Sequence, residues 1–412
     1  MTSTYSPGLE GVTAGISAIS EVDAERNALI YRGYDIHDLV DQCAFDEVAH
    51  LMLFGALPSA AELKSFRATV ASSRSVPEPI YDIFRIMPRG VDPMDALKAA
   101  IAVLATLDSD AADNSQDANL RRATRLYAQI PTLVVNGYRI SQGQDPVAPD
   151  PSLDHNANFF HMLTGGPKDE YFLKVLNVTQ ILYAEHGFNA STFAARVTVS
   201  TLSDLYSGVV SAIGALKGPL HGGANEAAME MLLEIGEPCA AKEWVAEALA
   251  LKKKIMGFGH REYKKGDERA KIVKKYAAEL GARTGDRKWG EISQIVEDAM
   301  MEAKGLYPNL DFPVASAYYL MEIPIPLYTP MFVMSRITGW CAHIIEQLDN
   351  NRIIRPHSEY NGPRGLRLAP SPGLSPKNGG EVTDRHAPTP NPSPKNRGGG
   401  TGRWVVPLTA LG

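Results

Sequence analysis

Hydrophobic positions recur along much of the chain at the spacing that places them on one face of a helix. Residues 45–55, FDEVAHLMLFG, form an amphipathic run closed by glycine. Ser59 and Glu62 follow as a capping box that opens the next helix. Asp92 lies just ahead of a proline, which predicts a capped helix over residues 93–107.

The helical pattern continues beyond a polar loop predicted at residues 109–117. It returns over 120–140, with a bend expected at the internal proline, and again over 169–185. Residues 191–217 are dense in Ala, Ser, Thr and Gly, which suits helices packed closely in a core or at a subunit interface. A further helix is expected to begin near residue 224. No stretch shows several alternating strands, so the predicted class is mainly α.

Composition narrows the class of protein. The chain has 412 residues, 44% of them hydrophobic and 21% charged, with a net charge of −6, as expected for a globular protein large enough for two domains. No transmembrane span or signal peptide is evident, so a cytoplasmic location is expected, with no membrane partner. The three cysteines lack metal-ligand spacing, and no long basic arm suggests binding to nucleic acid.

Residues 252–275, KKKIMGFGHREYKKGDERAKIVKK, carry ten Lys or Arg against three acids. Gly257 and Gly259 leave the amides around His260 open to a ligand, and the lysines can surround phosphates. This pattern indicates a docking place for a polyphosphorylated small molecule beside a reactive histidine. A solvated basic helix after a loop is the alternative.

A second histidine next to glycines, His221, precedes a predicted helix, whose dipole favours the neutral ring. A neutral imidazole can donate a hydrogen bond to a carbonyl that is becoming an enolate, although a structural histidine in a turn fits equally. Asp311 lies between apolar residues and is a candidate base with a raised pKa, or simply an N-cap. Arg336 lies in an apolar run and needs a carboxylate or an anionic ligand, so with Arg269 it suits a small polycarboxylate.

Several motifs together resemble citrate synthase. They cover roughly residues 8–364 in order: YRGYDIHDL (31–39), YAEHGFNAST (183–192), GALKGPLHGGANEA (214–227), MGFGHREYKKGDERAK (256–271), NLDFPVASAYY (309–319) and SRITGWCAHIIEQ with NNRIIRP (335–356).

The resemblance implies a mainly helical, two-domain homodimer. A large domain of residues 1–217 and 326–364 is expected to carry the dimer contacts and the oxaloacetate site. A small, mobile domain of residues 218–325 is expected to carry the CoA site and to close over oxaloacetate before acetyl-CoA binds. In this family the tail runs directly into an aromatic-valine-proline segment, which RWVVPL (403–408) resembles, so residues 403–412 are expected to be a remnant of that tail. Residues 365–402, rich in Pro and Gly with a repeated SPKN, are therefore predicted to be a low-complexity insertion.

The resemblance also implies roles at matching positions. Asp311 would take a proton from the acetyl methyl group, His221 would stabilise the enol at the thioester oxygen, and His260 would donate to the keto oxygen of oxaloacetate. No metal or redox cofactor is implied, because acetyl-CoA is a substrate. The other matching positions are those that hold oxaloacetate (His186, Arg269, Arg336 and, reaching in from the partner subunit, Arg355) and CoA (Lys253, Lys254, Ile255, Met256 and Gly257).

The chain departs from the family pattern at four positions. Glu262 stands where a small aliphatic residue is usual and Glu268 where D-P-R-A has proline, and these two acids are expected to weaken CoA binding. His357 replaces a common arginine. Tyr183 stands where some members have histidine, and Y-A-E-H also occurs in the methylcitrate synthase branch, so propionyl-CoA is an alternative substrate.

Two other functions compete with this hypothesis. A hydrolytic metal site built from the histidines and Asp311 is disfavoured by their wide spacing and by the nearby arginines. A catalytically silent, CoA-binding relative is disfavoured because all three catalytic residues are present.

Overall fold

The computed structural model describes residues 5–23, 25–260, 262–263 and 265–367. Residues 1–355 form one compact unit, and a second unit begins at Pro356. Within the described residues, no helix is both long and apolar enough to cross a membrane. The predicted insertion and tail remnant, from residue 368 onward, lie outside the described residues.

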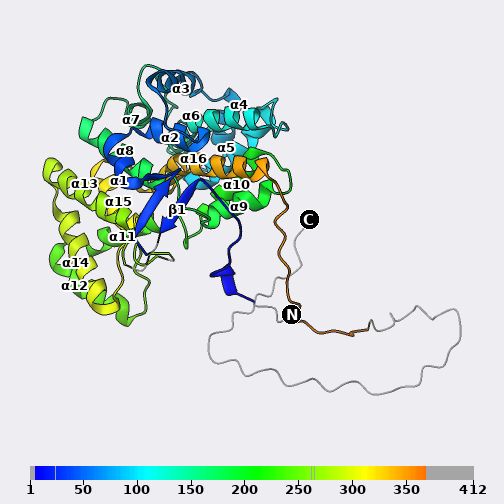
Figure 1. Cartoon of the computed structure of the whole chain (residues 1–412). Coiled ribbons are helices and arrows are strands. Elements are labelled where there is room, and N and C mark those ends of the chain that lie inside the picture. Colours follow the sequence, from blue (N-terminus) through cyan, green and yellow to red (C-terminus); the bar gives the residue numbers. More distant parts are fainter. Residues whose placement is uncertain (1–4, 24, 261, 264, 368–412) are drawn as a thin grey trace, which may run out of the picture. The chain divides into compact units, whose positions relative to one another are not determined.

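The described chain is mainly α, as predicted (Figure 1). The first ten helices are α1 (Ile36–Gln42), α2 (Phe45–Phe54), α3 (Ala60–Ser72), α4 (Glu78–Ile86), α5 (Pro93–Leu107), α6 (Gln116–Ser141), α7 (His155–Thr164), α8 (Glu170–Tyr183), α9 (Ala190–Val199) and α10 (Leu205–Leu216). The remaining elements are α11 (Ala224–Ile235), α12 (Pro238–Ala250), α13 (Glu268–Thr284), α14 (Lys288–Lys304), α15 (Asp311–Leu320), α16 (Tyr328–Asp349), the 3-10 helices η1 (Pro7–Leu9) and η2 (Ile325–Leu327), and the strands β1 (Ser20–Asp23), β2 (Ala28–Tyr31) and β3 (Tyr34–Asp35).

Local capping chemistry sets several of these helices where the sequence predicted them. Gly55 ends α2 in the left-handed conformation. Ser59 and Glu62 form the capping box of α3, and the side chain of Asp92 caps α5. Helix α6 begins at residue 116, whereas the sequence predicted a start at residue 120. Ser115 caps the helix by accepting a hydrogen bond from the N–H of Ala118, so the polar residues before residue 120 form its first turn.

A three-stranded antiparallel sheet, β1–β2–β3, was not predicted from the sequence. Its strands are two to four residues long, too short to show alternation. Ser20 pairs with Tyr31 across β1 and β2. The Tyr31 hydroxyl lies 2.9 Å from the carbonyl oxygen of Glu185 and 3.1 Å from that of Ile181. The sheet therefore fastens the end of α8, where His186 follows.

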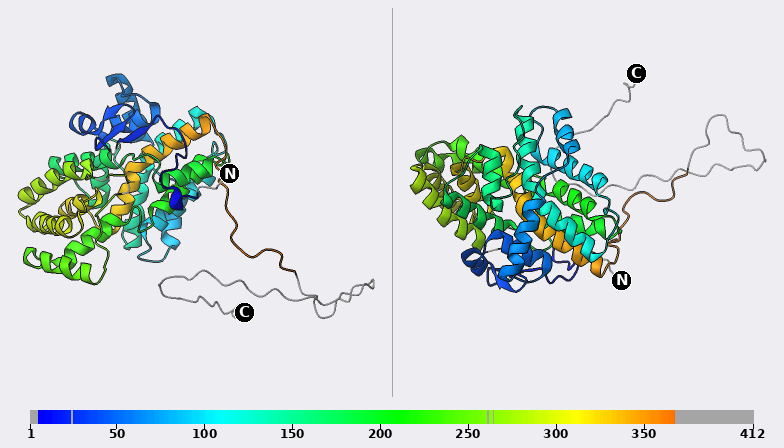
Figure 2. Two further views of the ribbon diagram at one scale, coloured as in Figure 1. Left: turned by 60° about the horizontal axis from the view of Figure 1, so that its bottom comes forward. Right: turned by 90° about the horizontal axis from the view of Figure 1, so that it is seen from above.

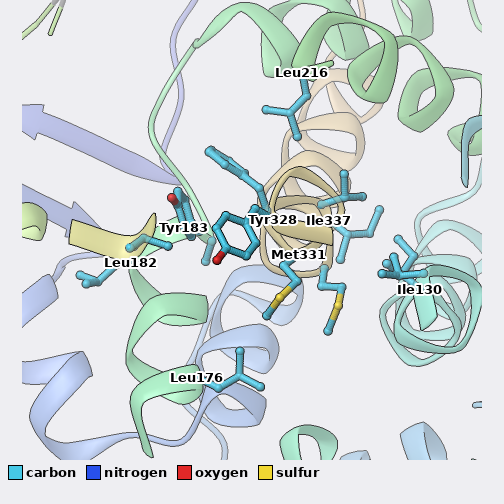
Figure 3. Close-up of a cluster of buried hydrophobic side chains, with 14 of the residues drawn as sticks. Ile130, Leu176, Leu182, Tyr183, Leu216, Tyr328, Met331 and Ile337 are labelled. Atoms are coloured by element: carbon cyan, nitrogen blue, oxygen red, sulfur yellow. The ribbon is translucent and has the colours of Figure 1, made fainter. Parts of the chain in front are cut away.

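Helix α16 runs through the core and is buried from Tyr328 to Ile345. It packs against α6, α8, α9 and α10. Figure 3 shows side chains from these helices converging on α16, including Ile130, Tyr183 and Leu216. Because Arg336 lies on this buried helix, the core holds its guanidinium in a water-poor setting.

Helices α11 to α15 gather on one side of this core in all three views (Figures 1 and 2). Within the group, α13 packs on α15, α11 on α15, and α12 on α14. The group corresponds to much of the predicted small domain. The domain boundaries at 217/218 and 325/326 stay a prediction.

Candidate active site

Asp311 is the first residue of α15, and its side chain does not cap that helix. Its Oδ1 instead accepts a 2.7 Å hydrogen bond from the hydroxyl of Tyr183, the last residue of α8. Although part of the side chain stays accessible, burial raises the pKa of Asp311 to about 6, against the lowering effects of Tyr183 and Arg269. Asp311 can therefore both accept and release a proton near neutral pH.

His221 lies in a tight turn between α10 and α11. Its backbone N–H donates to the carbonyl of Gly218 at 2.8 Å. The N–H of Gly222 donates to the carbonyl of Leu216, also at 2.8 Å. A Cβ on Gly222 would lie 2.6 Å from Leu216, so only glycine allows this turn.

The ring of His221 is neutral. Burial, aided by the charge of Arg336, lowers the pKa of His221 to about 4. Nε2 lies 2.8 Å from the Ser191 hydroxyl and accepts the Ser191 backbone N–H at 3.3 Å. Because Nε2 accepts, Nδ1 carries the proton and is the atom that can donate to a substrate.

The loop carrying His260 is fastened to the segment that leads to Asp311. The N–H of Gly259 donates to the carbonyl of Tyr307, and that of Asn309 donates to the carbonyl of Gly257, each at 2.9 Å. A Cβ on Gly257 would approach Phe312 to 2.8 Å, and φ is +82° there, so glycine is required.

Two backbone N–H groups orient the His260 ring. Nδ1 accepts from Glu262 at 3.1 Å and from Tyr263 at 3.2 Å. Since Nδ1 is an acceptor, the proton of the neutral ring lies on Nε2. The ring centroid is 5.0 Å from that of His186.

His186 and Arg336 each keep a buried nitrogen without a hydrogen-bond partner in the described structure. The atoms are His186 Nε2 and Arg336 Nη1, on side chains that are 8% and 1% exposed. Burial, with the charge of Arg269, lowers the pKa of His186 well below its ordinary value, so its ring is neutral. Arg336 Nε donates to the carbonyl of Tyr183 at 2.6 Å. A buried, unpartnered guanidinium N–H such as that of Arg336 Nη1 indicates a place for an anionic ligand.

Arg269, near the start of α13, forms a buried ion pair with Asp267. Burial opposes the charge of Arg269, but Asp267 outweighs it and raises the pKa of Arg269. The guanidinium carbon lies 5.9 Å from the ring centroid of Tyr263, which in turn contacts His260. A permanent positive charge therefore lies beside the histidine pair.

The structure brings six of the predicted residues into one electrostatic cluster. Arg336 acts on the pKa values of His186, His221 and Asp311, while Arg269 acts on those of His186 and Asp311. His260 joins through its contact with His186. Arg355 is exposed, and the described residues show no hydrogen bond or ion pair between it and this cluster.

The predicted CoA segment has a mixed environment. Lys253 is exposed but engaged, with Nζ 2.9 Å from both carboxylate oxygens of Glu234 and 4.7 Å from the ring centroid of Trp244. Lys254 is exposed, and Ile255 is buried in the core. Whether these residues bind CoA stays a prediction.

Glu268 faces elements that are distant in sequence. Its carboxylate accepts from Asn27 Nδ2 at 3.0 Å and from Lys271 Nζ at 2.5 Å, and lies 3.9 Å from His37 Nε2. Glu262 contributes its backbone N–H to His260 and is exposed. The expected weakening of CoA binding by these two acids stays a prediction.

Three contributions escaped the sequence analysis. Asp267 was passed over although it lies two residues before Arg269 at a helix start. Ser191, which contacts His221, was hidden in a run of small polar residues. The bond between Tyr183 and Asp311 joins positions 128 residues apart and had no local signal.

In the part of the chain that the structure describes, no cluster of three or more His, Cys, Asp or Glu is placed to hold a metal ion.

Comparisons with known proteins identify the family to which the chain is similar. The family model described as "Citrate synthase, C-terminal domain" matches residues 8–357. The chain is 46% identical over 355 residues to 2-methylcitrate synthase of Mycobacterium tuberculosis (strain ATCC 25618 / H37Rv), covering 86% of this chain and 90% of that protein. It is 45% identical over 368 residues to citrate synthase 2 of Bacillus subtilis (strain 168), covering 89% and 98%.

Solved structures give the same result. The crystal structure of citrate synthase from Pyrobaculum aerophilum matches with a TM-score of 0.83 and 40% identity, over 89% of this chain and 94% of that one. The ternary complex of citrate synthase from Thermoplasma acidophilum with carboxymethyl coenzyme A and oxaloacetate matches with a TM-score of 0.85 and 34% identity, over 89% and 98%.

Proposed function

The chain belongs to the citrate synthase family of acyltransferases, and we propose that it condenses acetyl-CoA with oxaloacetate and hydrolyses the product to citrate and CoA. The observation that carries this proposal is the pairing of Asp311, a carboxyl group with a raised pKa, with buried unpartnered nitrogens on His186 and Arg336. A dicarboxylate satisfies the free N–H of the Arg336 guanidinium, and condensation at its carbonyl needs such a base nearby.

The proposed reaction assigns a proton to each group. Asp311 removes a proton from the acetyl methyl group, and Nδ1–H of His221 donates to the thioester oxygen of the enol that forms. The enol carbon bonds to the keto carbon of oxaloacetate, whose oxygen takes the proton from Nε2 of His260. Water then cleaves the thioester of citryl-CoA and releases CoA. His186, Arg269 and Arg336 hold the carboxylates of oxaloacetate throughout.

The assembly we propose is a homodimer in which Arg355 reaches the site of the partner subunit. Its exposure at the end of the compact unit supports this role, since within one chain it meets none of the six clustered residues in the described structure. The group of helices α11 to α15 is proposed as the mobile domain, with the basic segment from Lys253 to Gly257 on CoA.

A second candidate substrate is propionyl-CoA, which would make 2-methylcitrate. Tyr183 beside Asp311 and the 46% identity to the mycobacterial 2-methylcitrate synthase favour it. One methylene alters discrimination by only about 1–3 kcal/mol, so the two acyl groups are best separated by kinetics.

The test is oxaloacetate-dependent release of CoA thiol from acetyl-CoA and from propionyl-CoA by the purified full-length chain. A higher kcat/KM with acetyl-CoA supports citrate synthesis, and a higher value with propionyl-CoA moves the chain to the methylcitrate branch. No release with either would identify a catalytically silent relative and overturn the proposal.

A further inference from the structure

Asp267 is a buried carboxylate, 2% exposed, that joins two parts of the site. Oδ1 accepts from the backbone N–H and from Nε of Arg269, at 3.1 and 3.0 Å. Oδ2 accepts from Nη2 of Arg269 at 2.8 Å and from the backbone N–H of Leu310 at 3.1 Å. Leu310 directly precedes Asp311. One side chain thus holds both a guanidinium and the peptide that leads to the base.

The ion pair also fixes which edge of Arg269 is engaged and which is left for other partners. Asp267 occupies the edge formed by Nε and Nη2, and Nη1 lies outside this pair. A two-pronged pair between a guanidinium and a carboxylate fixes the plane of the guanidinium as well as its position. Without Asp267, the guanidinium would be free to rotate and present a different edge.

We propose that Asp267 is a positioning residue, an inference that rests on the function proposed above. Asp267 orients Arg269 toward oxaloacetate and holds the segment with Asp311 at a fixed position relative to Arg269. The Asp267 carboxylate then positions both the arginine that binds the dicarboxylate and the base that acts on the acyl group. A misplacement of about 1 Å can cost about 100-fold in rate, so this coupling has a measurable consequence.

The negative charge of Asp267 supplies an independent readout. It raises the pKa of Asp311, as burial does, whereas Tyr183, Arg269 and Arg336 lower it. Removing the charge while keeping the shape therefore moves the pKa of Asp311 downward. The acid limb of kcat/KM, which reports the base in the free enzyme, moves with it to lower pH.

A purely structural role is the alternative, because Asp267 also caps α13 through the N–H of Arg269. Asp169 provides the matched control. It caps α8 through the N–H two residues on, Tyr171, at 2.7 Å, the same local pattern away from the clustered residues. Loss of a cap alone lowers the melting temperature in both variants and leaves the pH profile in place.

The experiment compares Asp267→Asn with Asp169→Asn in the full-length chain. For Asp267→Asn, the KM for oxaloacetate is expected to rise about tenfold or more, and the acid limb of kcat/KM to move to lower pH. Asp169→Asn is expected to change neither. Wild-type KM and pH profile in Asp267→Asn would overturn the inference.

A second variant, Asp267→Glu, keeps the test decisive if the Asn variant does not fold. Asp267 lines a cavity of about 440 Å³ between α13, α14 and α15. The charge is retained but displaced, so the KM for oxaloacetate is expected to rise while the acid limb stays. An unchanged KM would overturn the inference. If the wild type itself releases no thiol, the proposed function fails instead.

Discussion

The hydrogen bond from Tyr183 lowers the pKa of Asp311, the proposed base, and Tyr183→Phe removes that bond. The bond is 2.7 Å long and partly buried. The ring itself packs on Phe332, with 4.1 Å between centroids, and phenylalanine keeps that contact. The substitution therefore deletes one proton donor and little else.

The size of the effect follows from the geometry. A hydrogen bond to a charged group contributes about 1.5–3 kcal/mol, which corresponds to about 1–2 pKa units. Burial already raises the pKa of Asp311 to about 6, and Tyr183 opposes that rise. Without the hydroxyl, the pKa is expected to reach about 7–8.

The assay is oxaloacetate-dependent release of CoA thiol between about pH 5.5 and 9.5. At pH 7 the ionised fraction of Asp311 is expected to fall from about nine-tenths to between a half and a tenth, and to recover by pH 9. The acid limb of kcat/KM should therefore move upward by 1–2 units in Tyr183→Phe, with activity restored in alkali.

Tyr127→Phe is the matched control. Tyr127 donates a buried 2.8 Å hydrogen bond to Asp46, a pair of the same kind away from the clustered residues. Its loss is expected to lower stability and leave the acid limb in place. The reasoning is refuted if the limb of Tyr183→Phe stays at its wild-type position or moves to lower pH.

Three further predictions rest on the same cluster. Asp311→Asn should raise the melting temperature more at pH 8 than at pH 5. Between the ordinary pKa of 3.8 and the folded value of about 6, the native state of the wild type binds more protons at Asp311 than the unfolded state does. The stability of the wild type therefore falls as the pH rises through this range, by up to about 3 kcal/mol in total, and the variant does not have this loss. Glu268→Gln should lower the KM for acyl-CoA, because it removes one of the two acids expected to weaken CoA binding. It should change the free energy of unfolding by less than about 1 kcal/mol, because its partner Asn27 is only partly buried and His37 is exposed; steady-state kinetics and denaturant titration measure both. Arg336→Lys should raise the KM for oxaloacetate about ten- to a hundredfold, since lysine cannot reproduce the guanidinium fork.

Local chemistry explains what the sequence predicted correctly. Ser59 with Glu62, and Asp92 ahead of its proline, act within a few residues of chain, so their helices were placed well. The glycine turns around His221 and His260 are also local, since Gly222 and Gly257 are required by close backbone approach. These turns identified two residues of the cluster.

The features that escaped prediction depend on long-range packing. The small sheet is stabilised by contacts such as the one between Tyr31 and Glu185, and its short strands carry no period of their own. The pairing of Tyr183 with Asp311, and of Asp267 with the Leu310 peptide, arises only when α8 and α13 meet α15. No local sequence pattern predicts these contacts between helices that are distant along the chain.

The central claim is that Asp311 is the base of a condensation between an acyl-CoA and oxaloacetate. The most direct measurement is release of CoA thiol from acetyl-CoA by the wild type and by Asp311→Asn, each with and without oxaloacetate. The account predicts release that requires oxaloacetate and falls by at least about a hundredfold in the variant. Release without oxaloacetate, or undiminished turnover by Asp311→Asn, would contradict it.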